Sequence, residues 1–175
     1  MQAILCNEAQ HLSGEIVPAG DVRFSHLDPT DQKALTDHFA SLSPEDLRFR
    51  FGSPVSQAWV ARYLAGILEA PGQVLAAWAD GNIYALGELR PAHRGPEDAC
   101  EIAMSVLKPF RNQGVGTALL NTLLEDAMTM GFAYAHLQVI DENRPMRRIC
   151  RNLQAECARF GPDLIYSFSI GPCLI

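Results

Sequence analysis

One stretch limits the possible folds more than any other, the run from Glu101 to Leu120, EIAMSVLKPFRNQGVGTALL. Its first six residues predict a strand, and the apolar spacing after Gly114 and Gly116 predicts a helix. Glycine costs about 1 kcal/mol relative to alanine inside a helix. A helix start, however, offers free N–H groups and a partial positive charge, and glycine lets a bulky anion approach them. The stretch therefore predicts either a phosphate site or a tight strand-to-helix turn with nothing bound.

The remaining segments predict a mixed α/β sheet. Strands are expected at residues 22–26, 74–79, 83–89, 100–106, 135–140 and 164–170. Helices are expected after Asp28-Pro29, Ser43-Pro44, Ser53-Pro54, Gly116 and Asn143. Asp80-Gly81 predicts a hairpin turn. No repeat or linker divides the chain, so we expect one domain over residues 21–175, preceded by an arm over residues 1–20 with a short strand near Ile4-Leu5.

Composition excludes several classes of function. The net charge of −6 offers no general attraction for nucleic acid, and no apolar run reaches the roughly 20 residues of a membrane span. The five cysteines are odd in number and widely spaced, and the five histidines are scattered, so neither disulfides nor a metal site is predicted. The first residues lack the basic start of a secretory signal. Together these features favour a reduced, cytoplasmic protein.

The glycine stretch carries a resemblance to a known family. Arg111-x-x-Gly114-x-Gly116 matches the Q/R-x-x-G-x-G/A signature of the GNAT superfamily, the Gcn5-related N-acetyltransferases. Residues 101–149 resemble that family's strand, pyrophosphate loop, helix, strand and asparagine-containing helix. Residues 21–51 are similar to the bacterial branch that includes protein-lysine acetyltransferase domains. The resemblance implies an α/β (α+β) GNAT fold, with one mixed, mostly antiparallel sheet that is splayed at the cofactor site and has helices on both faces.

The same resemblance implies a reaction. Acetyl-CoA would be the co-substrate, and its acetyl group would pass by direct attack to a primary amine of a small molecule, a protein lysine or a protein N-terminus. Homodimers are common in the family. The alternative is a catalytically weak or inactive acyl-CoA-binding sensor that kept the cofactor site.

The resemblance also assigns cofactor contacts. Backbone groups of Met104 and Val106 would bind the pantetheine arm, and amides from Arg111 to Thr117 would surround the pyrophosphate, with Arg111 adding charge at the rim. Asn143 matches the family's asparagine near the pantetheine, although it can equally serve as a helix cap. The expected cofactor-binding residues are Met104, Ser105, Val106, Arg111, Asn112, Gln113, Gly114, Val115, Gly116, Thr117 and Asn143.

Glu101 is the expected catalytic base. An amine with a pKa near 10 is mostly protonated at pH 7, so a base acting directly or through water is useful. Several family members place a carboxylate at this strand position, and burial among apolar neighbours would raise the pKa of Glu101. Alternation puts Glu101 on the same strand face as Ser105, unless a bulge intervenes. The other interpretation is a carboxylate turned to solvent or paired with an arginine. An N–H of Met104 or Ser105 would stabilise the oxyanion.

The chain departs from the family where many members carry a tyrosine as general acid, because that position is Cys150. The general acid is therefore unassigned, although a thiolate with a pKa near 8.5 can leave with help from water alone. The usual Leu-Gly-Phe ending of this helix is also altered. The arginines of the helix are interpreted as one solvated face, and they are Arg144, Arg147, Arg148 and Arg151.

Overall fold

The computed structural model describes residues 22–93 and 96–171, so the predicted N-terminal arm lies outside the described residues. Seven strands form one sheet in the order β1-β2-β3-β4-β5-β7-β6. They are β1 (Phe24–His26), β2 (Gln73–Ala79), β3 (Asn82–Pro91), β4 (Ala99–Val106), β5 (Tyr134–Ile140), β6 (Glu156–Phe160) and β7 (Asp163–Ser169). Only the β4–β5 pair is parallel among these neighbours. The predicted mixed, mostly antiparallel sheet is confirmed.

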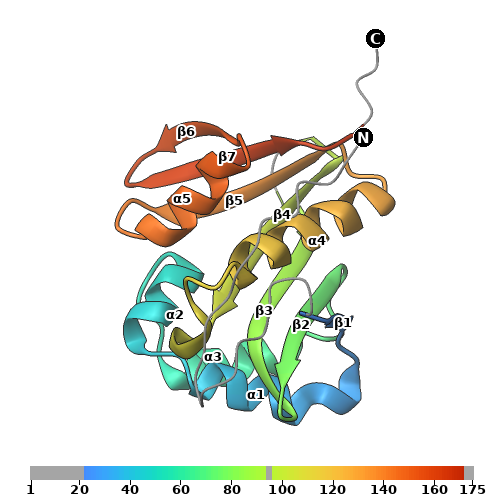
Figure 1. Cartoon of the computed structure of the whole chain (residues 1–175), viewed down its shortest axis with the longest axis vertical. Helices are drawn as coiled ribbons and strands as arrows, with labels where there is room; N and C mark the ends of the chain where they lie inside the picture. Colours follow the sequence, from blue (N-terminus) through green and yellow to red (C-terminus); the bar gives the residue numbers. More distant parts are fainter. Residues whose placement is uncertain (1–21, 94–95, 172–175) are drawn as a thin grey trace.

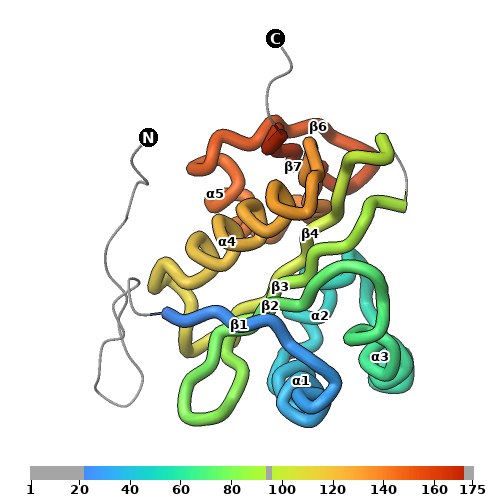
Figure 2. Tube along the Cα trace, turned by 90° about the vertical axis from the view of Figure 1, so that its right-hand side faces the viewer, coloured from blue at the N-terminus to red at the C-terminus, as the bar shows by residue number. Residues whose placement is uncertain are grey.

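Helices cover both faces of the sheet, as predicted (Figure 2). They are α1 (Gln32–Ala40), α2 (Pro44–Phe51), α3 (Gln57–Leu64), α4 (Val115–Thr129) and α5 (Arg144–Asn152), with short 3-10 turns at Pro29–Asp31 and Lys108–Phe110. One core lies under α4 and includes Leu119 and Leu123. The other lies under α1 and α3 and includes Leu35 and Leu64. No helix of the described ranges combines the length and the apolar character needed to cross a membrane.

Local signals account for most element boundaries. Ser43 begins α2 with a reciprocal capping box to Asp46. The hairpin between β2 and β3 turns at Asp80 and Gly81, both with positive φ, as a two-residue hairpin turn requires. The predicted start of α3 at Ser53 is wrong, because the residue that caps this helix is Ser56, whose hydroxyl accepts from the amide of Trp59.

Strand β6 is absent from the sequence prediction. All five of its residues are exposed, so the strand lacks the alternation between buried and exposed side chains that identifies a half-buried strand. It forms a hairpin with β7 across Gly161, whose φ is +60°. Pairing with β7, rather than any pattern of its own, makes this edge segment a strand.

The sheet splits at β4. Strand β3 pairs with β4 from Cys100 to Val106, whereas β5 pairs with β4 only from Ala99 to Glu101. Beyond Glu101 the two strands separate, and the edge of β4 that faces β5 is left open. In Figure 1, β3 and β4 run together past α2, while β5, β7 and β6 lie apart from them beside α5. The splay predicted at the cofactor site is therefore present.

Candidate cofactor and active site

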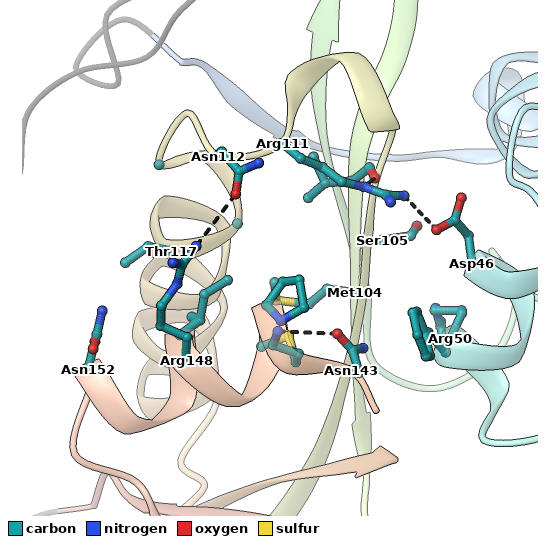
Figure 3. A pocket seen from close by; sticks show the side chains of 17 residues that line it. Asp46, Arg50, Met104, Ser105, Arg111, Asn112, Thr117, Asn143, Arg148 and Asn152 are labelled. Atoms are coloured by element: carbon teal, nitrogen blue, oxygen red, sulfur yellow. Dashed lines mark hydrogen bonds and ion pairs between the residues drawn. The ribbon is translucent and has the colours of Figure 1, made fainter. Parts of the chain in front are cut away.

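A cavity of about 390 Å³ lies along the end of β4, beyond the point where β5 separates from it. Four elements meet there, namely α2, the open end of β4, the loop that begins α4, and α5 (Figure 3). Its lining residues are Asp46, Phe49, Arg50, Met104, Ser105, Val106, Arg111, Asn112, Gly114, Gly116, Thr117, Asn143, Pro145, Met146, Arg148, Ile149 and Asn152. The tertiary structure thus brings together all of the predicted cofactor residues except Gln113 and Val115.

The open edge of β4 presents main-chain groups to this cavity. The amide of Leu107 donates to the carbonyl of Tyr84 on β3, at 2.8 Å. Since the N–H groups of alternate strand residues point the same way, the amide of Ser105 also faces β3, and those of Met104 and Val106 face the open edge. The β3–β4 register runs without a shift, so no bulge changes this phase. Of the two oxyanion donors considered, the Met104 amide is the one on the cavity side.

The glycine loop provides a row of free amides. In the described ranges, the amides from Asn112 to Thr117 have no protein acceptor, and the first α4 amide to find one is that of Ala118, which donates to Gly114. Asn112 and Gly114 have positive φ values of 60° and 78°, a conformation that glycine adopts without strain. Consecutive free amides at a helix start form an anion site. The loop therefore provides the row of free amides that a phosphate site requires.

Gly116 has a packing role that sequence reasoning missed. A Cβ atom here would lie 3.1 Å from the terminal methyl of Ile149 on α5. The glycine thus lets α4 and α5 approach each other beside the cavity, in addition to leaving room for an anion.

Two loop residues pack into the protein and do not line the cavity. Val115 is buried under the sheet, and the side chain of Gln113 donates to the carbonyl of Pro109 at 2.9 Å.

The Arg111 side chain joins the loop to α2. Its Nε donates to the carbonyl of Val106 at 2.8 Å, and its Nη2 lies 2.7 Å from Oδ1 of Asp46 (Figure 3). Partial burial tends to raise the pKa of Asp46, but hydrogen bonds from Ser43 and Arg111 outweigh it and hold that pKa below its ordinary value. Arg111 therefore lines the cavity, with one carboxylate already bound to it.

Helix α5 closes the other side of the cavity. The Asn143 side chain caps this helix by accepting from the Met146 amide at 3.2 Å, and Asn143 also lines the cavity. Arg148 faces the glycine loop, with its Nη2 3.5 Å from Oδ1 of Asn112 (Figure 3). Arg148 is exposed, as the solvated-face interpretation of the arginine run expects, and it also lines the cavity. Its position five residues after Asn143, on the face that turns toward α4, is a signal that sequence reasoning did not use.

Glu101 lies where β4 and β5 begin to separate, opposite Arg90 on β3 and His136 on β5. It is exposed and is not among the residues that line the cavity. The burial of Glu101 among apolar neighbours that the sequence predicts is therefore absent. Glu101 shares its strand face with Ser105, in agreement with the alternation.

Cys150, at the family's tyrosine position, lies in the core beneath the sheet and is fully buried. Burial raises the pKa of its thiol to about 12. Burial likewise raises the pKa of Cys100 to about 11, and neither thiol lines the cavity. These cysteines fill core space, and the thiol at the family's tyrosine position does not line the cavity.

A buried ionic cluster supports the α2 side. Arg50 and Glu88 form an ion pair with side chains 6% and 5% exposed. The Tyr63 hydroxyl donates to Glu88 at 2.5 Å, and Arg90 approaches the other Glu88 oxygen at 3.4 Å. Burial raises the pKa of Tyr63 above its ordinary value, so its hydroxyl stays protonated and keeps donating. Alternating arginine and phenylalanine in LRFRF gave no indication that one arginine of the pair would be buried beside the cavity.

The sequence model of the acetyltransferase (GNAT) family matches residues 38–153, more than half of the chain. The chain belongs to the GNAT family. Acetyl-CoA is the typical co-substrate of this acetyltransferase family, and the cavity fits it, because free loop amides suit a pyrophosphate and an open strand edge suits an amide-containing arm.

Solved GNAT structures share the fold. The GNAT domain of S. lividans PAT superimposes with a TM-score of 0.72 at 20% identity, over 85% of this chain and 90% of that one. A phosphinothricin acetyltransferase from Sinorhizobium meliloti, solved in complex with AcCoA, gives 0.67 at 16% identity, over 86% and 89%. A ribosomal-protein-alanine N-acetyltransferase from Brucella melitensis gives 0.65 at 17%, over 85% and 99%. Since the names of the latter two proteins indicate different acceptors, the shared fold does not identify the acceptor of this GNAT chain.

Proposed function

We propose that this GNAT chain transfers the acetyl group of acetyl-CoA to a primary amine, of a small molecule or of a protein lysine or N-terminus, by direct attack. The observation that carries the proposal is the meeting, in one cavity, of free loop amides and an open strand edge. The free amides of residues 112–117 lie at one end, and the open edge of β4 at Met104 and Val106 lies along it.

Each surface has a task in the reaction. Bound acetyl-CoA supplies an activated thioester, which an amine can attack without a further cofactor. The loop amides and Arg111 would hold the pyrophosphate, and the Met104 carbonyl and the Val106 amide would align the pantetheine arm as an added strand. The Met104 amide, on the cavity side of β4, would donate to the oxygen of the reacting carbonyl.

Glu101 remains our proposed base. Since it is exposed beside the split and does not line the cavity, it would act through water. Direct attack is supported by the positions of the cysteines, because the buried thiols of Cys100 and Cys150 cannot reach a bound thioester.

The experiment is release of free coenzyme A from acetyl-CoA in the presence of polyamines, amino acids, aminoglycosides or lysine-containing peptides. We expect amine-dependent release with at least one class of acceptor. Tight acetyl-CoA binding without acceptor-dependent release from any of them would contradict the proposal and favour the sensor alternative. Glu101→Gln should lower turnover and spare cofactor affinity, and an unchanged pH–rate profile would remove Glu101 from the mechanism.

A further inference from the structure

A histidine and a serine are paired at the cavity in a way that the proposed mechanism does not use. His38 lies on the inner face of α1, 2% exposed, and its Nε2 lies 2.8 Å from the hydroxyl of Ser105 on β4. Its other ring nitrogen, Nδ1, lies 3.0 Å from the carbonyl oxygen of Ile83. Ser105 lines the cavity, and its side chain lies on the side of β4 that faces α2 (Figure 3).

The partners of His38 determine where its proton lies. A carbonyl oxygen can only accept a hydrogen bond, so Nδ1 must carry the proton that is donated to Ile83. Burial, aided by the charge of Arg50 and only partly offset by the bond to Ile83, lowers the pKa of His38 to about 4. The ring is therefore neutral at pH 7, and Nε2 is an acceptor.

It follows that the Ser105 hydroxyl donates its proton to His38. Its oxygen then has no proton left for the cavity and presents lone pairs alone. Such a group binds a donor. A bound thioester offers its carbonyl oxygen and sulfur, which are acceptors, whereas an attacking amine offers N–H groups.

We infer that Ser105, fixed by His38, accepts a hydrogen bond from the attacking amine and so orients the nitrogen lone pair toward the thioester. The loop and α5 occupy the cofactor side of the cavity, so the amine would arrive on the α2 side, where Ser105 lies. The inference rests on the proposed function. Ser105 is a hydrogen-bonding residue of the acceptor site, and His38 is a positioning residue.

Ser105 keeps its own proton throughout this reaction. A bond forms between the amine nitrogen and the carbonyl carbon, the carbon–sulfur bond breaks, and the proton lost by nitrogen reaches the departing sulfur through solvent. The lowered basicity of His38 is consistent with this role, because a weak base does not activate serine as a nucleophile.

The chain contains a matched control. His136 and Ser167 form a second histidine–serine hydrogen bond, 2.9 Å long and half-buried, between β5 and β7, and neither residue lines the cavity. Ser167→Ala removes the same type of bond as Ser105→Ala without touching the cavity.

The test measures the activity of these variants toward one amine. That amine is whichever of spermidine, glycine, kanamycin and a lysine tripeptide with an acetylated N-terminus is most active in the coenzyme A release assay. We expect Ser105→Ala to lower kcat/KM for the amine about tenfold, the effect of one lost hydrogen bond, and to change the affinity for acetyl-CoA, measured by calorimetry, less than about twofold. Ser105→Thr should restore most of the rate. His38→Phe should give a similar loss, and the double variant should be no worse than either single variant.

Three results would overturn the inference. One is a loss of kcat/KM in Ser105→Ala no larger than that in Ser167→Ala, which would make the pair structural. Another is an acetyl adduct on Ser105 found by mass spectrometry during turnover, which would make Ser105 a nucleophile. The third is a nitrogen NMR spectrum that places the His38 proton on Nε2. If no amine is turned over by the unaltered protein, the proposed function fails first, and the NMR result still reports separately on the pair.

Discussion

The glycine loop and helix α2 line different sides of the same cavity, and they treat their polar groups in opposite ways. In the loop, the amides from Asn112 to Thr117 have no acceptor within the described residues. On the α2 side, Arg50 is paired with Glu88, Asp46 with Arg111, and Ser105 with His38. An anion is thus expected at the loop, where donors are free. On the α2 side, these pairings fix the positions of the polar side chains, and none of the paired groups is a free donor for an anion.

The largest effect, on the free energy of unfolding, should come from breaking the buried ion pair between Arg50 and Glu88 on the α2 side. Glu88→Gln would leave Arg50 and Arg90 without their shared carboxylate, so we expect the free energy of unfolding to fall by about 3–5 kcal/mol. Urea denaturation followed by circular dichroism measures this loss. Asp141→Asn is the control, because Asp141 pairs with Arg147 and Arg159 near the surface and should shift the urea midpoint little. Equal shifts of the urea midpoint in both variants would show that the buried pair contributes no more to stability than the pairs near the surface.

The second effect is a pH dependence of stability that originates at His38. Its pKa falls from 6.5 to about 4 on folding, so the unfolded chain binds a proton more readily. This contribution is complete above pH 6.5 and is lost as the pH falls from 6.5 toward 4, by up to roughly 3 kcal/mol. His38→Phe should lack that part of the slope. An identical slope in this variant, measured by urea denaturation at each pH, would assign the dependence to other groups.

Changes at the loop should affect cofactor affinity more than folding. Arg148 faces Asn112 across the cavity and can add positive charge near a bound phosphate. We therefore expect Arg148→Ala to weaken acetyl-CoA binding about fivefold, with a smaller loss at high salt. Arg151→Ala is the matched control, since Arg151 is exposed on the same helix and does not line the cavity. Calorimetric titration would contradict the prediction if both variants lost affinity equally.

The smallest effect, on acetyl-CoA affinity, is expected at the ion pair between Asp46 of α2 and Arg111 of the loop. The Asp46 carboxylate binds Arg111, so it competes with a phosphate for that guanidinium. Asp46→Asn keeps an oxygen that can accept from Ser43 and removes the competing charge. Acetyl-CoA affinity should therefore rise about twofold to threefold, a gain typical of a partly exposed ion pair. A fall in affinity would show instead that Asp46 holds Arg111 in its binding position.

Local sequence determined much of this molecule. Capping boxes, the Asp80-Gly81 turn and apolar periodicity marked most helices and strands, because each of these signals acts within a few residues of the chain. The glycine loop was also readable, since its residues are contiguous and their amides remain free wherever the loop is placed. The edge strand β6 was missed because it depends on pairing with β7.

Only the tertiary structure decided what surrounds that loop. His38 and Ser105 are 67 residues apart in the chain, and Arg50 and Glu88 are 38 apart, so no local pattern could show that they meet. Burial also decided the states of these groups, neutral for His38 and paired for Glu88. The packing of the elements also placed Cys150 in the core and left Glu101 exposed. The sequence by itself thus determined the family and the cofactor loop, whereas packing between distant elements set the positions and protonation of the side chains that face the acceptor.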